Sequence, residues 1–268
     1  MALDSTVQQR FDACVTRGEL SLPLLPEVAT QVLAMADRPT VDARQLADLL
    51  RRDPSLTAHV MHLAASPMYA GATKLVSLQQ VIGRLGLATI TQLALAVATR
   101  MRVFAVAGFE PEVRATFRHS LASALFAQEI ARARRSVVDL AFLAGLLHDI
   151  GKPLALQVLV DLHAELAIVP DRAAVLAEAE RVHAELGGTL IASWSLAPRI
   201  ADAVRAHHAP AGDELALTVA LGDRFAHALA GDAFAGDELA GALNLYPEDV
   251  ARLAARGADI GTSIEVFA

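Results

Sequence analysis

Seven histidine and aspartate residues run in order between residues 119 and 223 of this chain, each inside or at the end of a helix-like segment. They are His119, His148, Asp149, His183, His207, His208 and Asp223. Imidazole nitrogens and carboxylate oxygens bind iron, manganese or zinc where no thiolate is available. Any one of these residues alone would more often be an ordinary core or surface residue. The ordered set instead predicts a metal site on which several helices converge.

Glycine and proline residues beside the series favour this convergence. The adjacent ligands at 148–149 and 207–208 are followed by Gly151 and Pro210, so both pairs are predicted at helix ends. Neighbouring side chains diverge by about 100° inside a helix, whereas a helix end allows them to face one point. Gly187 follows the histidine at 183 by one turn and leaves room for an ion or a substrate.

The number of ligands indicates more than one ion. Three or four protein ligands are typical of one catalytic ion, so the longer series predicts two divalent transition metal ions, with Asp149 as a candidate bridge. The series contains no cysteine, so iron or manganese is preferred over zinc. Lys152 follows closely and is a candidate phosphate contact. The other histidines are interpreted as ordinary core or surface residues: His59, His62, His163 and His227.

The fold is predicted to be all-α. Hydrophobic residues make up 54% of the chain and aromatic residues only 4%, so alanine and aliphatic side chains supply the apolar surface. Alanine is the best helix former, and few stretches alternate with the period of a strand. Helices are predicted at 27–37, 41–51, 89–106, 111–134, 138–148, 171–188, 198–208 and 214–230, with others opening at Asp53-Pro54 and Ser77 and short ones after 237. Residues 161–170 are predicted to be less regular.

Residues 108–111 (GFEP) form the best candidate boundary within the chain. They divide it into an N-terminal helical lobe, residues 1–108, and a metal-binding lobe, residues 109–268. Only the second lobe carries a series of possible ligands. The two lobes are expected to pack together as one unit.

Charge and hydropathy exclude several classes of partner. The formal net charge of −7 argues against broad nucleic-acid binding, which needs a basic surface. The most apolar segment, residues 89–108, is interrupted by Arg100 and Arg102, so no membrane span is predicted. Residues 1–10 lack a signal-peptide pattern. One cysteine, Cys14, excludes an intrachain disulfide, and a cytoplasmic protein is the simplest interpretation.

Residues 146–152 (LLHDIGK) resemble the signature of the HD superfamily of metal-dependent phosphohydrolases. The superfamily pattern falls on His119, His148, Asp149 and Asp223. The additional histidines at 183 and 207–208 are similar to the longer ligand set of the HD-GYP branch, whose members hydrolyse cyclic di-GMP.

More of the chain, roughly residues 10–230, resembles the HDOD family, the HD-related output domains of bacterial signalling proteins. The blocks that carry this resemblance occur in the family's order: 22–28 (LPLLPEV), 53–56 (DPSL), 66–69 (SPMY), 85–86 (LG), 144–151 (AGLLHDIG), 183–187 (HAELG), Trp194 and 207–208 (HH). The resemblance implies an all-helical fold in which an N-terminal helical lobe packs on an HD-like lobe.

The resemblance leaves two main functions open. One is a regulatory signal-transduction protein that binds a protein partner or a small phosphorylated ligand. The other is a metal-dependent phosphohydrolase acting on a nucleotide or another phosphoester, and a di-iron oxygenase is a third, weaker alternative. The segment after His208 lacks the GYP loop, which implies weak or absent cyclic di-GMP hydrolysis. Ala115 is not a carboxylate, so the third metal of some HD-GYP relatives lacks a ligand here.

Overall fold

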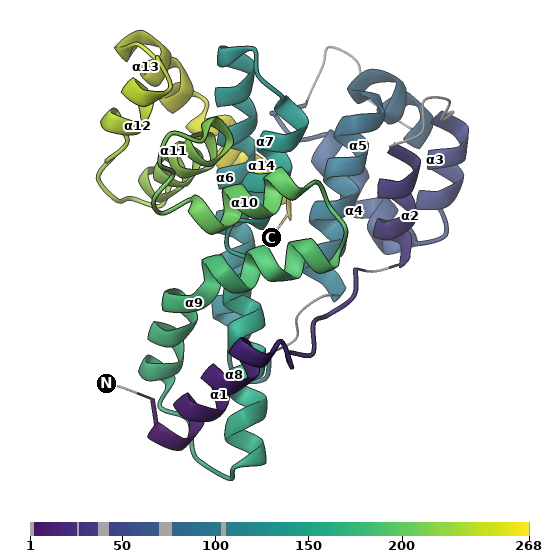
Figure 1. Ribbon diagram of the computed structural model, residues 1–268. Helices are drawn as coiled ribbons and strands as arrows, with labels where there is room; N and C mark the ends of the chain where they lie inside the picture. The colour runs from purple at the N-terminus through teal and green to yellow at the C-terminus, as the bar shows by residue number, and fades with distance from the viewer. Residues whose placement is uncertain (1–2, 26, 37–42, 70–76, 103–105, 268) are drawn as a thin grey trace.

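The computed structural model describes residues 3–25, 27–36, 43–69, 77–102 and 106–267, and within these ranges the chain is helical with no strand (Figure 1). The helices are α1 (Ser5–Arg17), α2 (Glu27–Ala36), α3 (Ala43–Leu50), α4 (Pro54–Ala64), α5 (Leu78–Arg102), α6 (Glu110–Arg134), α7 (Val138–Leu147), α8 (Gly151–Glu165), α9 (Arg172–Ser193), α10 (Pro198–Ala206), α11 (Glu214–Leu229), α12 (Asp237–Ala242), α13 (Pro247–Ala255) and α14 (Gly257–Phe267). The predicted all-α class is confirmed.

Helices α2 to α5 pack on one another, and α5 also contacts α6 and α7 (Figure 1). Helix α1 lies apart from them and packs along α8. Helix α14 closes the other side, where it contacts both α4 and α6. Residues 1–108 therefore supply helices to both halves of the molecule, because the first helix of that range packs on the second lobe.

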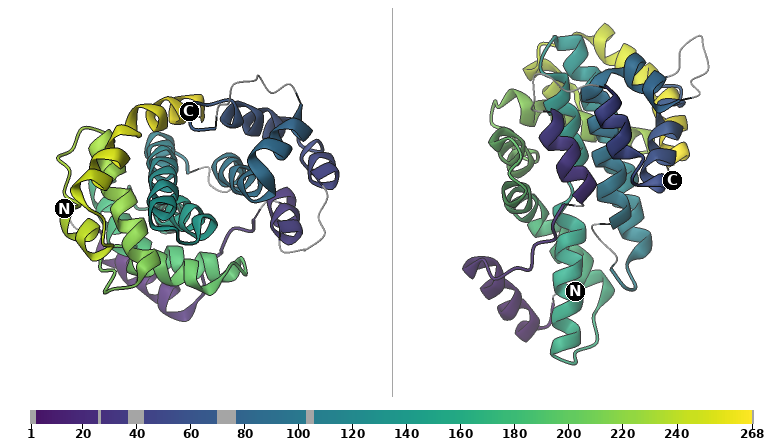
Figure 2. Two further views of the ribbon diagram at one scale, coloured as in Figure 1. Left: turned by 90° about the horizontal axis from the view of Figure 1, so that it is seen from above. Right: turned by 90° about the vertical axis from the view of Figure 1, so that its right-hand side faces the viewer.

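The HD-like lobe is built around α6. Helices α7 and α11 pack against α6, while α8 and α10 pack against α9 (Figure 2). The close crossings use small residues. A Cβ on Gly145 would lie 2.9 Å from the Ala124 backbone, and one on Gly222 would lie 2.8 Å from the Ser123 carbonyl. Glycine at both positions lets α7 and α11 approach α6 closely enough to place their polar side chains around one point.

A single buried hydrophobic cluster runs from Val7 in α1 to Ile264 in α14. Polar contacts also join the two halves. Gln92 Nε2 in α5 donates to Asp139 Oδ1 in α7 at 2.6 Å, and Trp194 Nε1 donates to the Pro23 carbonyl at 2.8 Å. Buried residues of both halves therefore belong to one hydrophobic cluster. That the two lobes form one folding unit stays a prediction.

Several helix signals in the sequence are confirmed. Asp53 Oδ1 accepts from Leu56 N at 3.1 Å, and Ser77 Oγ accepts from Gln80 N at 3.2 Å, so both residues begin helices as predicted. Gly86 has φ +82°, and the backbone kinks there within α5, which continues to Arg102. The start predicted at residue 41 lies outside the described residues.

The helix predicted at 138–148 ends at Leu147, before Gly151, as expected. Two other predictions are wrong. The segment expected to be irregular is partly helical, because α8 begins at Gly151, with Pro153 in its first turn, and continues to Glu165. Proline is tolerated in the first turn of a helix, where the missing N–H has no intrahelical partner. Helix α9 passes through Gly187 and Gly188 and ends only at Ser193.

Within the described ranges, one stretch is long and apolar enough to be considered as a membrane span, namely Val138–Glu165. It comprises α7, a turn and α8, and 72% of its most apolar window is buried inside the protein. Its apolar character is therefore that of a core.

Residues 109–268 alone should be poorly soluble or loosely packed. This fragment lacks α5, which covers α7, and α1, which covers α8. Helices gain most of their stability from burial of an apolar face, so these exposed faces should loosen the fragment. Near-UV circular dichroism and binding of a hydrophobic dye, compared with the full chain, measure the effect. A monomeric, cooperatively folding fragment with full metal content would instead identify two independent domains.

Candidate metal centre

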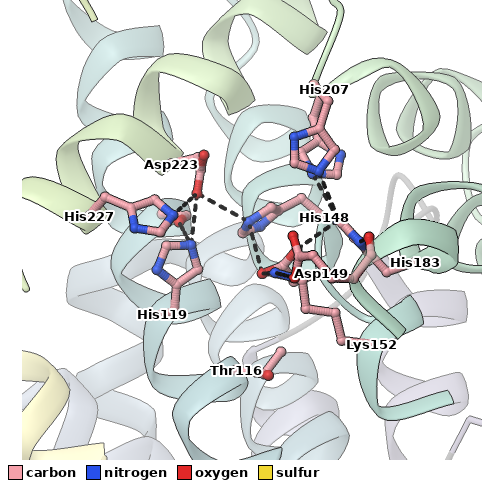
Figure 3. Close-up of polar contacts among 12 residues, drawn as sticks. Thr116, His119, His148, Asp149, Lys152, His183, His207, Asp223 and His227 are labelled. Carbon is pink, nitrogen blue, oxygen red and sulfur yellow. Dashed lines mark hydrogen bonds and ion pairs between the residues drawn. The ribbon is translucent and has the colours of Figure 1, made fainter. Parts of the chain in front are cut away.

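The structure brings the seven residues of the series, His119, His148, Asp149, His183, His207, His208 and Asp223, to one region of the HD-like lobe (Figure 3). They come from α6, the turn between α7 and α8, α9, the end of α10 and α11. Five of them are buried, His119 is half-buried and His208 is exposed. Both adjacent pairs lie directly after a helix, as their flanking residues predicted.

The series divides into two groups. In the first, His119 Nε2 lies 2.8 Å from Asp223 Oδ1, and His148 Nε2 lies 3.7 Å from the same oxygen. In the second, His183 Nε2 lies 3.3 Å from His207 Nε2 and 3.0 Å from His208 Nε2. The donor atoms of His183, His207 and His208 lie close enough together to hold one ion, and so do those of His119, His148 and Asp149. Asp223 forms a further such cluster with His119 and His227.

Asp149 lies between the two groups. Its Oδ2 is 3.5 Å from His148 Nε2 in the first group, and its Oδ1 is 3.2 Å from His183 Nε2 in the second. Each carboxylate oxygen thus faces a different set of imidazoles. This is the placement that a bridging ligand requires.

Backbone carbonyls fix the orientation of three imidazoles. Nδ1 lies 2.8 Å from the Gly145 carbonyl in His148, 2.5 Å from Glu180 O in His183 and 2.6 Å from Val204 O in His207. A carbonyl only accepts, so each Nδ1 carries a proton, and Nε2 of each ring, when neutral, is left to face the centre. Carbonyl-anchored imidazoles of this kind are typical metal ligands.

The surroundings of His148 Nε2 show whether these residues suit a metal ion. It is buried and has no hydrogen-bond partner among the described residues, although two carboxylates lie nearby. A buried polar atom without a partner costs free energy unless something satisfies it. A cation bound by Nε2 and these carboxylates would do so, and the residues present therefore fit a metal.

The charges around the centre keep the candidate ligands in their binding forms. Burial alone would raise the pKa of Asp149, but His148 and Lys152 outweigh it and hold that pKa well below its usual range. Burial likewise opposes ionisation of Asp223, but the hydrogen bond with His119 and the nearby His148 hold its pKa well below its usual range. Both carboxylates are therefore ionised at neutral pH.

The second group of imidazoles behaves differently. Burial, followed by the nearby His148, lowers the pKa of His207 to about 3. Burial also lowers the pKa of His183, although Asp149 opposes that shift. For His148, burial acts in the same sense but is outweighed by Asp149 and Asp223, which raise its pKa. Neutral His183 and His207 are in the form that binds metal.

Lys152, predicted to contact a phosphate, lies on two carboxylates. Its Nζ is 2.9 Å from Asp149 Oδ2 and 2.9 Å from Glu180 Oε2. In this position it orients Asp149 and balances its charge. Its contact with a phosphate stays a prediction.

His227 was interpreted as an ordinary residue, but it lies beside the centre (Figure 3). Its Nε2 is 3.5 Å from Asp223 Oδ1, and its Nδ1 is 3.0 Å from Asp232 Oδ2. Asp223 and His227 are four residues apart on one helix, so their side chains share a face. That spacing was the signal in the sequence.

Two cavities reach the centre from outside. One, of about 420 Å³, is lined by Arg118 and His119 and by α14. The other, of about 520 Å³, is lined by His207, His208 and Arg224. Small molecules can therefore approach both groups of candidate ligands.

Comparison with known proteins agrees with this architecture. The model of the HDOD domain family matches residues 22–210, which is more than two thirds of the chain. No curated protein matches.

Several solved structures share the fold. A "putative metal-dependent phosphohydrolase" from Shewanella amazonensis superposes with a TM-score of 0.74 at 22% identity, covering 97% of this chain and 100% of that one. A "putative signal transduction protein" from Marinobacter aquaeolei gives 0.64 at 24% identity, covering 92% and 60%. An HDOD domain protein of unknown function from Geobacter sulfurreducens gives 0.61 at 23% identity, covering 95% and 99%.

The family match extends over α2 to α10, and the last candidate ligand, Asp223, follows in α11. The helical fold and the ordered sequence blocks agree with it. The chain belongs to the HDOD domain family.

Proposed function

We propose that this chain is a regulatory signal-transduction protein whose HDOD fold holds a centre of two divalent metal ions. The position of Asp149 between two groups of imidazoles carries the proposal. One ion would be held by His119, His148, Asp149 and Asp223, and the other by Asp149, His183, His207 and His208. Iron or manganese suits these nitrogen and oxygen ligands better than zinc.

Family membership supports a regulatory role. The match covers the N-terminal helices as well as the HD-like lobe, and those helices contribute no member of the ligand series. Their surface is free to serve a protein partner or a small phosphorylated ligand. The structural relative from Marinobacter is itself named as a signal transduction protein, which agrees with this role.

Phosphoester hydrolysis is the second candidate, and the two cavities favour it. Each presents an arginine beside candidate ligands, Arg118 in one and Arg224 in the other. Arginine suits phosphate oxygens, although Arg118 also pairs with Glu265. Two bound metal ions would supply polarisation of a phosphoryl oxygen and a deprotonated water. The relative from Shewanella bears the name of such an enzyme.

Purified without chelator and reconstituted with iron or manganese, the protein should hold two metal ions per chain. In the proposed centre the two ions would have separate imidazole ligands and would share only Asp149. Elemental analysis by inductively coupled plasma mass spectrometry, with protein concentration from amino-acid analysis, gives the stoichiometry. Far less than one equivalent of every transition metal after reconstitution would contradict the two-metal proposal.

Cyclic di-GMP should be hydrolysed weakly or not at all. The ligands alone do not select a substrate, because selectivity comes from the walls around them. The loop after His208 is short, and Pro210 and Gly212 stand where the HD-GYP resemblance would place its characteristic segment. Chromatography of the reaction of metal-loaded protein with cyclic di-GMP measures this, and bis(p-nitrophenyl) phosphate tests general phosphodiesterase activity. Efficient cyclic di-GMP turnover would favour phosphoester hydrolysis over the regulatory role as the function of this protein.

A further inference from the structure

A cavity away from the candidate ligands lies between α2 and α5 on one side and α7 and α10 on the other. Its volume is about 580 Å³, and the turn between α9 and α10 closes one end. We call it the interlobe cavity. Ligand sites for small molecules commonly have volumes of about 300–1,000 Å³ and are mostly apolar.

Most of the interlobe cavity is apolar, but one side is polar. The apolar walls include Leu140 and Leu143 of α7 and Leu196 of the α9–α10 turn. The polar side consists of Thr91 and Gln92 of α5 and Asp139 of α7. Among the described residues that line the cavity, Asp139 is the only one with an ionisable side chain, and it gives this lining one negative charge.

Hydrogen bonds hold this polar side in place. Gln92 is buried, and its Nε2 donates to Asp139 Oδ1 at 2.6 Å. Its Oε1 accepts from Gln128 Nε2 at 3.3 Å, and Gln128 Oε1 in turn accepts from Tyr69 OH. The second carboxylate oxygen, Oδ2 of Asp139, has no hydrogen-bond partner among the described residues. Asp139 is exposed, so this acceptor oxygen lies at the solvent-facing edge of the apolar cavity, beside the buried Gln92.

We propose that the interlobe cavity binds a small amphipathic cation, an organic amine with an apolar body. The ammonium group would donate to Asp139 Oδ2, and the body would lie against the leucines of α7 and the α9–α10 turn. An ammonium matches the single negative charge, and its pKa, like that of lysine, keeps it protonated at neutral pH. A carboxylate or phosphate ligand would meet Asp139 as a like charge.

Two helices connect the interlobe cavity to the metal centre. Helix α7 begins beside Asp139 and ends at the turn that carries His148 and Asp149, while α10 begins near Ile200 and ends at His207. An occupant of the cavity therefore contacts two helices whose far ends present candidate ligands. This last step rests on the proposed function, whereas amine binding does not.

Binding to the interlobe cavity can be measured through the fluorescence of Trp194. It is the only tryptophan of the chain, and it lines the cavity. The full-length protein is titrated with n-octylamine, n-octanol and sodium octanoate at neutral pH, following Trp194 fluorescence and confirming each titration by calorimetry. We expect saturable binding of the amine, about tenfold tighter than the alcohol, as one additional charge-assisted hydrogen bond provides, with octanoate the weakest.

Two variants and a matched control locate the site. Asp139→Asn should bring the affinity for octylamine down to that for octanol, and Ala88→Phe should block both by filling the cavity. Asp202→Asn removes an exposed aspartate elsewhere on α10 and should change neither. Equal affinities for amine and octanoate, no saturable binding of any probe, or an amine preference that survives in Asp139→Asn would each overturn the proposal. Metal content is measured in every variant, so loss of the metal centre is scored separately from loss of amine binding.

Discussion

Replacing Asp149 with alanine should remove most of the bound metal while leaving α2 to α5 folded. The carboxylate faces both ligand groups, at 3.5 Å from His148 Nε2 and 3.2 Å from His183 Nε2. Its loss would remove a ligand from each ion and the negative charge that lies between the imidazoles. Metal content should fall from two ions per chain to well below one, because protonated imidazoles at this spacing repel one another and a bound cation.

Asp149→Asn distinguishes lost coordination from lost packing. Asparagine keeps the volume and one oxygen but loses the charge that balances Lys152. We expect it to bind metal weakly while retaining the far-ultraviolet spectrum of the parent. Asp202→Ala serves as the control, since this carboxylate is exposed on α10 and pairs only with Arg205 among the described residues. Metal content equal to that of the parent in both Asp149 variants would show that Asp149 is not the bridge.

The sequence could predict which histidines and aspartates the fold brings together because their signal is local. Each adjacent pair of candidate ligands lies directly after a helix, and the order of the residues resembles a known family pattern. The sequence could not predict how the charges balance. The ammonium of Lys152 reaches Asp149 and Glu180 only because α8 and α9 cross at this point. His227 was missed because a lone histidine is usually an ordinary residue.

The helix ends show a second limit of sequence patterns. Gly151 looks like a residue that stops a helix, since glycine is common just after helix ends. In the structure it begins α8, and its missing side chain serves the contact with α9. The interlobe cavity was beyond prediction for a related reason. Its walls come from segments between residues 25 and 200, which only the packing of the two halves brings together.

Gly151→Ala should destabilise the protein by about 3 kcal/mol or more, a large part of the 5–15 kcal/mol typical of a folded protein. A Cβ at this position would lie 1.9 Å from the His183 carbonyl oxygen and 2.7 Å from Gly187 N. Both atoms belong to the backbone of α9, so no side chain can move aside and the two helices must separate. Urea denaturation followed by circular dichroism measures the change in the free energy of unfolding.

Alanine substitutions at two other glycines serve as comparisons for the change in stability. A Cβ on Gly187 would meet the Val204 side chain at 3.2 Å and Gly151 N at 3.3 Å, so Gly187→Ala should cost less. Gly83 lies within α5 and has no atom within 4 Å of an added Cβ, so Gly83→Ala should stabilise by about 1 kcal/mol. Because α8 follows Asp149 directly and α9 carries His183, Gly151→Ala should also lower metal affinity. A Gly151→Ala protein as stable and as metal-rich as the parent would show that the crossing of α8 and α9 is not what holds the two ligand groups together.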